Sequence, residues 1–151
     1  MYGAYYKQWE FDDFIEIQDI SSGYKGSNEI WVKYGKLQVK AIGRWISGNL
    51  NYTLKKRDTI TIKCQLNNTD APTRATISLN NKYNQPIISL YSELRRYPMV
   101  RCGNSVNSFP QIPLSTQLIL TIKINDNNYE VILKKEDGQE IMRDSSNRYM
   151  Q

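Results

Sequence analysis

Apolar and polar side chains alternate without interruption over eight residues near the middle of the chain, Thr59-Ile60-Thr61-Ile62-Lys63-Cys64-Gln65-Leu66. Successive side chains of an extended strand point to opposite faces, so a period of two gives the strand one apolar and one polar face. Such a strand is typical of an antiparallel sheet with one face on a core. We therefore predict a half-buried strand over residues 59–66.

The same alternation returns in the C-terminal third of the chain, over residues 118–124 and 129–133. The Asn-rich residues 125–128 separate these stretches and favour a hairpin turn. Asp137-Gly138 is a second turn signal, so residues 139–143 are expected to return as a third strand. One core between two sheets is predicted to hold the following residues: Ile60, Ile62, Leu66, Leu118, Leu120, Ile122, Val131 and Leu133.

The rest of the chain also favours short strands over helices. Further strands are expected at residues 14–18, 29–34, 36–42, 50–55, 73–80 and 86–92. Residues 97–113 contain three prolines and a glycine and are expected to form a long loop, an element that often binds a partner. Many short strands at regular spacing predict an all-β protein, an antiparallel β-sandwich of jelly-roll-like form.

Length and composition predict one domain without catalytic chemistry. The chain has 151 residues, which corresponds to a single domain, expected over residues 21–151 after an N-terminal arm or first strand over residues 1–20. It contains no histidine, which removes the usual base of Ser-His-Asp and Cys-His sites and the commonest zinc ligand. We therefore expect no enzyme activity, no catalytic residue, no metal and no cofactor.

The remaining candidates for chemistry do not alter that expectation. The carboxylates of Asp12 and Asp13 point to opposite faces if they lie on a strand, and those of Glu136 and Asp137 lie in a solvated turn. The polar residues 125–130 offer oxygen ligands for calcium but lack the EF-hand spacing. Cys64 and Cys102 have no CxxC spacing, and whether they pair is left open, since a disulfide needs an oxidising compartment.

Charge divides the chain into an acidic start and a basic remainder. Residues 1–20 hold one lysine and five acids, a sum of −4, so the other residues sum to +9 in a chain of net charge +5. The interaction candidates of this arm are Tyr5, Tyr6, Trp9, Phe11, Phe14, Asp12 and Asp13. Apolar rings beside carboxylates suit docking on a basic sandwich, either its own or a neighbour's. The alternative is a first strand that covers a sheet edge of the same subunit.

A second candidate surface for a ligand or partner combines rings and cations: Arg44, Trp45, Arg95, Arg96 and Tyr97. A ring beside a cation, as in Arg44-Trp45, suits stacking on a sugar or a base, although a core tryptophan is the alternative. The basic runs are short and typical of solvated strand ends, so nucleic acid is not expected as a partner. The N-terminus lacks the features of a secretory signal, and no apolar run is long enough for membrane insertion.

Two stretches carry a resemblance to known families. Residues 31–45, which read WVKYGKLQVKAIGRW, resemble the opening strands of β-sandwich modules on bacteriophage virion appendages, such as tail fibres, head fibres and capsid accessory proteins. Residues 109–138 are similar to the closing strands of galectin-type sandwiches, but the His-Asn-Arg and Trp-Glu-Arg sets that bind sugar in galectins are absent. The resemblance implies a sandwich and carries over no sugar site.

Together these features predict a non-enzymatic structural or attachment protein of a virus particle, such as a decoration or fibre component of a bacteriophage. It is expected to be made in the host cytoplasm, to reside in the virion and to contact copies of itself or other virion proteins. The first alternative is a carbohydrate-binding module that recognises a host-surface glycan through an exposed platform such as Trp45, Tyr91 or Tyr97. The second is a small basic protein that binds nucleic acid or a host defence factor.

Overall fold

The computed structural model describes residues 20–21, 30–33, 36–39, 49–50, 53–67, 74–93 and 97–150, with side chains for 53–67, 75–92 and 97–150. The chain divides into two compact units, residues 1–53 and 54–151. Every regular element among the described residues is a β-strand. The expected division after residue 20 stays a prediction, because most of the arm lies outside the described residues.

The first unit contains two short antiparallel strand pairs. β1 (Ile20–Ser21) pairs with β4 (Asn49–Leu50), and β2 (Ile30–Lys33) pairs with β3 (Lys36–Val39). The strands expected around residues 29–34 and 36–42 are thus confirmed. Of the strand expected at 50–55, Leu50 lies in β4, the described residues 53–55 belong to no strand, and residues 51–52 lie outside the described residues. The strand expected at 14–18 lies outside the described residues.

The second unit contains two antiparallel sheets of four strands each. The first sheet has the order β12-β11-β10-β5. Its strands are β5 (Thr59–Cys64), β10 (Leu118–Ile124), β11 (Tyr129–Lys135) and β12 (Glu140–Ser146). The hairpins predicted from the alternating C-terminal residues are therefore confirmed, and β5 pairs with β10 through contacts such as Ile62 opposite Leu120.

The second sheet is a meander of consecutive strands in the order β6-β7-β8-β9. These strands are β6 (Arg74–Asn80), β7 (Pro86–Glu93), β8 (Met99–Cys102) and β9 (Ser105–Ser108). The prediction of a long loop over residues 97–113 is wrong, because this region contains the β8–β9 hairpin. A two-residue turn joins the strands, and Gly103 takes its first position with a φ of +59°, which a glycine adopts without strain.

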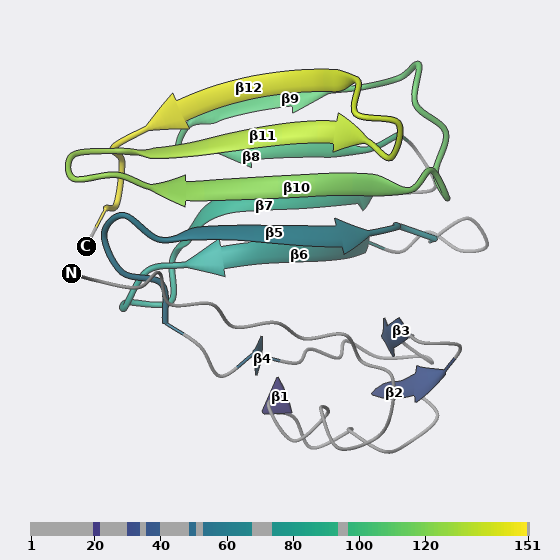
Figure 1. Ribbon diagram of the computed structural model, residues 1–151, viewed down its shortest axis with the longest axis horizontal. Helices are drawn as coiled ribbons and strands as arrows, with labels where there is room; N and C mark the ends of the chain where they lie inside the picture. The colour runs from purple at the N-terminus through teal and green to yellow at the C-terminus, as the bar shows by residue number, and fades with distance from the viewer. Residues whose placement is uncertain are drawn as a thin grey trace, which may run out of the picture. The chain divides into compact units, whose positions relative to one another are not determined.

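The two sheets face each other, with β12-β11-β10-β5 in front of β6–β9 in Figure 1, and enclose one hydrophobic core. The prediction of an all-β antiparallel sandwich is confirmed. The strand order specifies the sandwich further, because a jelly roll consists of two Greek keys, whereas β6 to β9 lie side by side in chain order as a simple meander. The described strands therefore form a sandwich of a different order from a jelly roll.

The predicted core residues are buried at the centre of the sandwich and partly exposed at the edge formed by β5. Six of the eight predicted residues are buried: Leu66, Leu118, Leu120, Ile122, Val131 and Leu133. Ile60 and Ile62 pack against this cluster but stay partly exposed. Both belong to β5, which in the described part of its sheet is the last strand and has a neighbouring strand on one side only.

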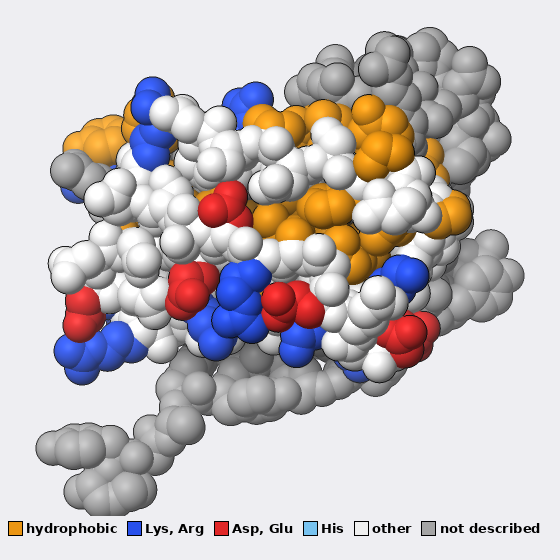
Figure 2. Space-filling model, turned by 90° about the horizontal axis from the view of Figure 1, so that it is seen from above, with side chains coloured by type: hydrophobic (Ala, Val, Ile, Leu, Met, Phe, Trp, Pro, Cys, Tyr) orange, Lys and Arg blue, Asp and Glu red, His pale blue; other side chains and the backbone are white. Residues whose placement is uncertain are grey.

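Apolar side chains also reach the surface along the opposite edge. Figure 2 shows this face, on which hydrophobic side chains lie beside charged ones. Val106 of β9 is exposed, and Ile141 and Met142 of β12 are partly buried. Among the described strands, β9 and β12 each have a partner on one side only, so this edge combines free backbone groups with apolar side chains.

Candidate functional site

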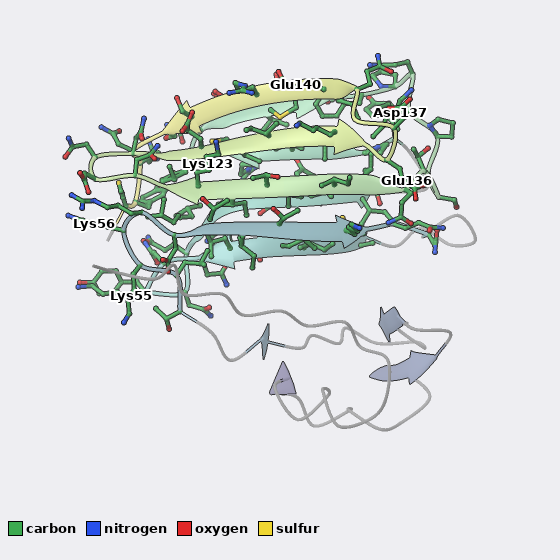
Figure 3. The ribbon with its side chains drawn as sticks, in the orientation of Figure 1. Lys55, Lys56, Lys123, Glu136, Asp137 and Glu140 are labelled. Atoms are coloured by element: carbon green, nitrogen blue, oxygen red, sulfur yellow. The ribbon has the colours of Figure 1, made fainter. Side chains whose placement is uncertain are left out.

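Four segments meet at one end of the sandwich, which we call the turn end: residues 53–58, 81–85, 125–128 and 147–150. They meet because β6, β10 and β12 run toward this end, whereas β5, β7 and β11 start from it (Figure 1). Figure 3 shows Lys55, Lys56 and Lys123 at the turn end. Glu136 and Asp137 lie at the opposite end, in the β11–β12 turn.

The turn end is basic. Its four segments carry five cations and two acids: Lys55, Lys56, Arg57, Lys82 and Arg148 against Asp58 and Asp126. The Arg57 Nε atom lies 3.2 Å from Asp126 Oδ1, in an exposed ion pair that lowers the pKa of the Asp126 carboxyl. Asp58 accepts a hydrogen bond from the backbone N–H of Lys55. Both acids are therefore occupied by local contacts, while most of the cations face solvent.

A shallow pocket of about 370 Å³ opens at the turn end, between the β6–β7 turn and the segment that follows β12. It is lined by Asn81, Tyr83, Gln85, Asn147, Tyr149 and Met150. We call it the tyrosine–amide pocket. Its lining has two aromatic rings and three amide side chains and contains no carboxylate, so it offers stacking surfaces together with neutral donors and acceptors.

The amide of Asn81 holds the two walls of the pocket together. Its Oδ1 accepts hydrogen bonds from the backbone N–H groups of Tyr83 and Gln85, both at 3.0 Å. Its Nδ2 donates to Gln85 Oε1 at 2.8 Å and to the backbone carbonyl of Tyr149 at 3.0 Å. This last bond links residues 68 positions apart, so the pocket has a defined shape before any ligand binds.

The two tyrosine rings are exposed and each lies beside a cation. Tyr83 is 63% exposed, with Lys82 Nζ 5.2 Å from the centre of its ring. Tyr149 is 42% exposed, with the Arg148 guanidinium carbon 4.6 Å from its ring centre. Arg148 also donates a hydrogen bond of 2.8 Å to the Tyr149 hydroxyl. A cation at this distance over a ring is attracted to it, so these contacts restrain both rings while leaving much of their surface to solvent.

Buried Tyr129 anchors the C-terminal wall of the pocket to the core. Its side chain is fully buried, and its hydroxyl donates a hydrogen bond of 2.5 Å to the backbone carbonyl of Arg148. The next residue, Tyr149, has a φ of +59°, a conformation that costs a non-glycine residue about 1–2 kcal/mol. The surrounding hydrogen bonds hold this conformation, which directs the chain along the pocket.

Most of the predicted interaction residues lie outside the described residues: Tyr5, Tyr6, Trp9, Phe11, Phe14, Asp12, Asp13, Arg44, Trp45, Arg95 and Arg96. Of the second candidate surface, Tyr97 is described and is half-buried. Tyr91, considered for a sugar platform, is buried in β7, so that expectation is wrong. It points from the central part of a sheet, where strands on both sides limit exposure.

Tyr83 and Tyr149 were not among the residues predicted from the sequence, although the sequence carries a signal for them. Asn81-Lys82-Tyr83 and residues 147–149 share the order asparagine, cation, tyrosine. The first copy follows the strand predicted over residues 73–80, and the second follows the observed end of β12, where an aromatic ring has no core to enter. A search for aromatic residues in turns would have found both.

The two cysteines and the polar stretch considered for calcium have structural roles in the sandwich. Cys64 and Cys102 are free thiols, and burial raises the pKa of Cys64 to about 11 and that of Cys102, which also lies near Asp144, to about 12. Asn125 Nδ2 donates to Glu130 Oε2 at 2.9 Å, which ties the polar stretch considered for calcium into a turn. Within the described part of the chain, no group of three or more His, Cys, Asp or Glu gathers at a metal-binding distance.

No family model, no curated protein and no solved structure matches this chain. In the ranges that the structure describes, no helix has the length and apolar character needed to cross a membrane.

Proposed function

We propose that this protein acts by binding, as a small structural or attachment component of a virus particle such as a bacteriophage. The observation that carries the proposal is the division of charge between residues 1–20, which sum to −4, and the rest of the chain, which sums to +9. Opposite charges on two parts of one chain favour contacts between copies or with other virion proteins, because complementary fields speed encounter and set the docking register.

Two features of the sandwich support this role. The turn end carries a net charge of +3 in its four segments, which attracts an acidic segment. The edge formed by β9 and β12 adds exposed Val106 and two strands that have a partner on one side only among the described strands, which suits burial against a partner. The five aromatic rings between residues 5 and 14 would supply the apolar contact, since aromatic anchors carry much of the affinity of protein interfaces.

The test compares the solution mass of the full chain with that of two full-length variants, measured by light scattering over a range of concentrations. In one variant, Tyr6, Trp9 and Phe14 become alanine, and in the other, Asp12 and Asp13 become asparagine. We expect the wild type to be oligomeric and the ring variant to dissociate. We expect the charge variant to associate more slowly but to reach a similar mass, because charge acts mainly on the rate of encounter.

The competing arrangement is an arm that covers a sheet edge of its own subunit. In that case the ring variant melts at a lower temperature than the wild type, and its mass does not change. A monomeric wild type, or an oligomer that the ring variant leaves intact, would overturn the proposed assembly role.

Carbohydrate binding is the second candidate function, and the tyrosine–amide pocket is the observation that favours it. Exposed rings with neighbouring amides are suited to a polar ligand with flat apolar faces.

A further inference from the structure

We propose that the tyrosine–amide pocket at the turn end is a saccharide-binding site. The proposal develops the second candidate function and does not depend on the assembly role, because the described pocket is made of residues 81–85 and 147–150 and its described lining includes no residue of the arm. It rests on three features: two exposed rings, free amide groups and a pocket held in shape by hydrogen bonds.

The exposed rings offer surfaces on which a sugar can stack. The C–H groups of a pyranose form a flat apolar patch, and tyrosine presents a rigid ring that loses little entropy when it is covered. Lys82 and Arg148 each lie over one face of their tyrosine ring, which leaves the remaining surface for a ligand. Tyr83 and Tyr149 are 63% and 42% exposed as residues, so they have area to bury, and burial of that area favours binding.

The amides supply hydrogen bonds for sugar hydroxyls. Gln85 Oε1 accepts a bond from Asn81, whereas Gln85 Nε2 has no partner among the described residues. The side-chain amide of Asn147 and the Tyr83 hydroxyl also have no partner among the described residues. An amide donates and accepts at the same time, and so does a sugar hydroxyl, so these groups can pair without burying an unpaired charge.

Preorganisation lowers the cost of binding. Three side-chain hydrogen bonds of Asn81 lie within the β6–β7 turn, and a fourth joins the turn to the carbonyl of Tyr149. Tyr129 fixes the adjoining carbonyl of Arg148. A ligand therefore does not have to order the walls, which would otherwise weaken its affinity. The pocket volume of about 370 Å³ falls within the lower part of the range of small-molecule sites.

A saccharide fits the pocket better than nucleic acid does. Nucleic-acid affinity depends on neutralising a row of phosphates, whereas the six lining residues of the pocket are uncharged and two cations, Lys82 and Arg148, lie beside its rings, enough for a single acidic group. Because none of the described residues that line the pocket carries a carboxylate, they do not repel an acidic sugar, which gains from Lys82 and Arg148. We therefore expect neutral and uronic-acid saccharides to bind, with the uronic acid bound more tightly at low salt.

The test is a titration of the full-length ¹⁵N-labelled protein with tetrasaccharides of mannose, of N-acetylglucosamine and of galacturonate, followed by NMR. We expect shifts in the side-chain amides of Gln85 and Asn147, with at least one dissociation constant of about 1 mM or lower. Tyr83→Ala should weaken binding by about two- to tenfold, which is the range for loss of one aromatic contact, and Tyr83→Phe should retain most of it. Thermal melting of each variant checks that it is folded.

The matched control replaces an exposed glutamine at the other end of the sandwich. Gln85→Ala should weaken binding, whereas Gln111→Ala, which removes an amide outside the pocket, should leave it unchanged. The proposal is overturned if no tetrasaccharide binds, or if Tyr83→Ala and Gln85→Ala both bind as the wild type does. It is also overturned if the same amides respond to a single-stranded oligonucleotide with a steep salt dependence and to no saccharide.

Discussion

Replacement of Gly103 by alanine should destabilise the sandwich by two separate effects. Gly103 occupies the β8–β9 turn with a φ of +59°, and a Cβ atom placed there would lie 2.2 Å from Ser146 Oγ and 2.8 Å from Ser146 Cβ. Ser146 ends β12 in the opposite sheet, so this close approach joins the two layers at the turn end. The absence of a side chain at position 103 is therefore required both by the turn and by the packing of the sheets.

The expected loss of unfolding free energy follows from these two causes. A left-handed conformation costs an alanine about 1–2 kcal/mol. Forcing an extra methyl group into a filled space costs about 1–3 kcal/mol. Ser146 does not move away freely, because its Oγ accepts a hydrogen bond of 3.1 Å from the backbone N–H of Arg148. We expect Gly103→Ala to cost about 2–5 kcal/mol in total.

Gly138 provides a matched control for the backbone effect alone. It lies in the β11–β12 turn with a φ of +93°, and a Cβ atom there would meet nothing within 4 Å. Equilibrium unfolding in urea should give a loss of about 1–2 kcal/mol for Gly138→Ala and a clearly larger loss for Gly103→Ala. Equal losses within about 0.5 kcal/mol would show that the contact with Ser146 carries no energy and would refute the reasoning.

Three further outcomes are expected. Leu120→Ala should cost about 3–5 kcal/mol and Ile62→Ala clearly less, since Ile62 is only partly buried; urea unfolding that gives equal losses would contradict this. Cys64 and Cys102 should react slowly with a thiol reagent up to about pH 9, and fast labelling at pH 8 would contradict their burial. The free energy of unfolding should fall as the pH rises from 9.0, the ordinary thiol pKa, to about 11–12, because the two thiols ionise at lower pH in the unfolded chain than in the folded one. Tyr129→Phe should keep the fold but increase amide hydrogen exchange in residues 147–150, and unchanged exchange would show that its hydroxyl does not anchor them.

The alternating stretches could be predicted because period-two patterns depend on local geometry alone. The strands at residues 59–64, 118–124 and 129–135 follow from side chains that must point either to the core or to water. The β8–β9 hairpin was missed because its strands have only four residues each and lie among prolines, which are typical of loops. Short strands gain their stability from neighbours in the sheet, and this contribution is not visible in their own sequence.

The order of the strands and the location of the pocket were beyond prediction for a related reason. Alternation tells which side of a strand is buried but not which strand lies beside it, so it did not distinguish a meander from a jelly roll. The walls of the pocket are 68 residues apart at Asn81 and Tyr149, and they meet only because β6 and β12 run toward the same end of the sandwich. Their proximity is a consequence of topology.

The core and the pocket are physically connected through Tyr129. Its ring is fully buried beneath the turn end, and burial raises the pKa of its hydroxyl, which keeps that group protonated as a donor. The hydroxyl bonds the carbonyl of Arg148, whose guanidinium in turn lies over the Tyr149 ring. Because Gly103 must stay small to let Ser146 lie close beside this tyrosine, the packing of the two sheets also sets the position of the pocket wall. A binding surface on short turns can thus be rigid when a buried residue of the sandwich holds it.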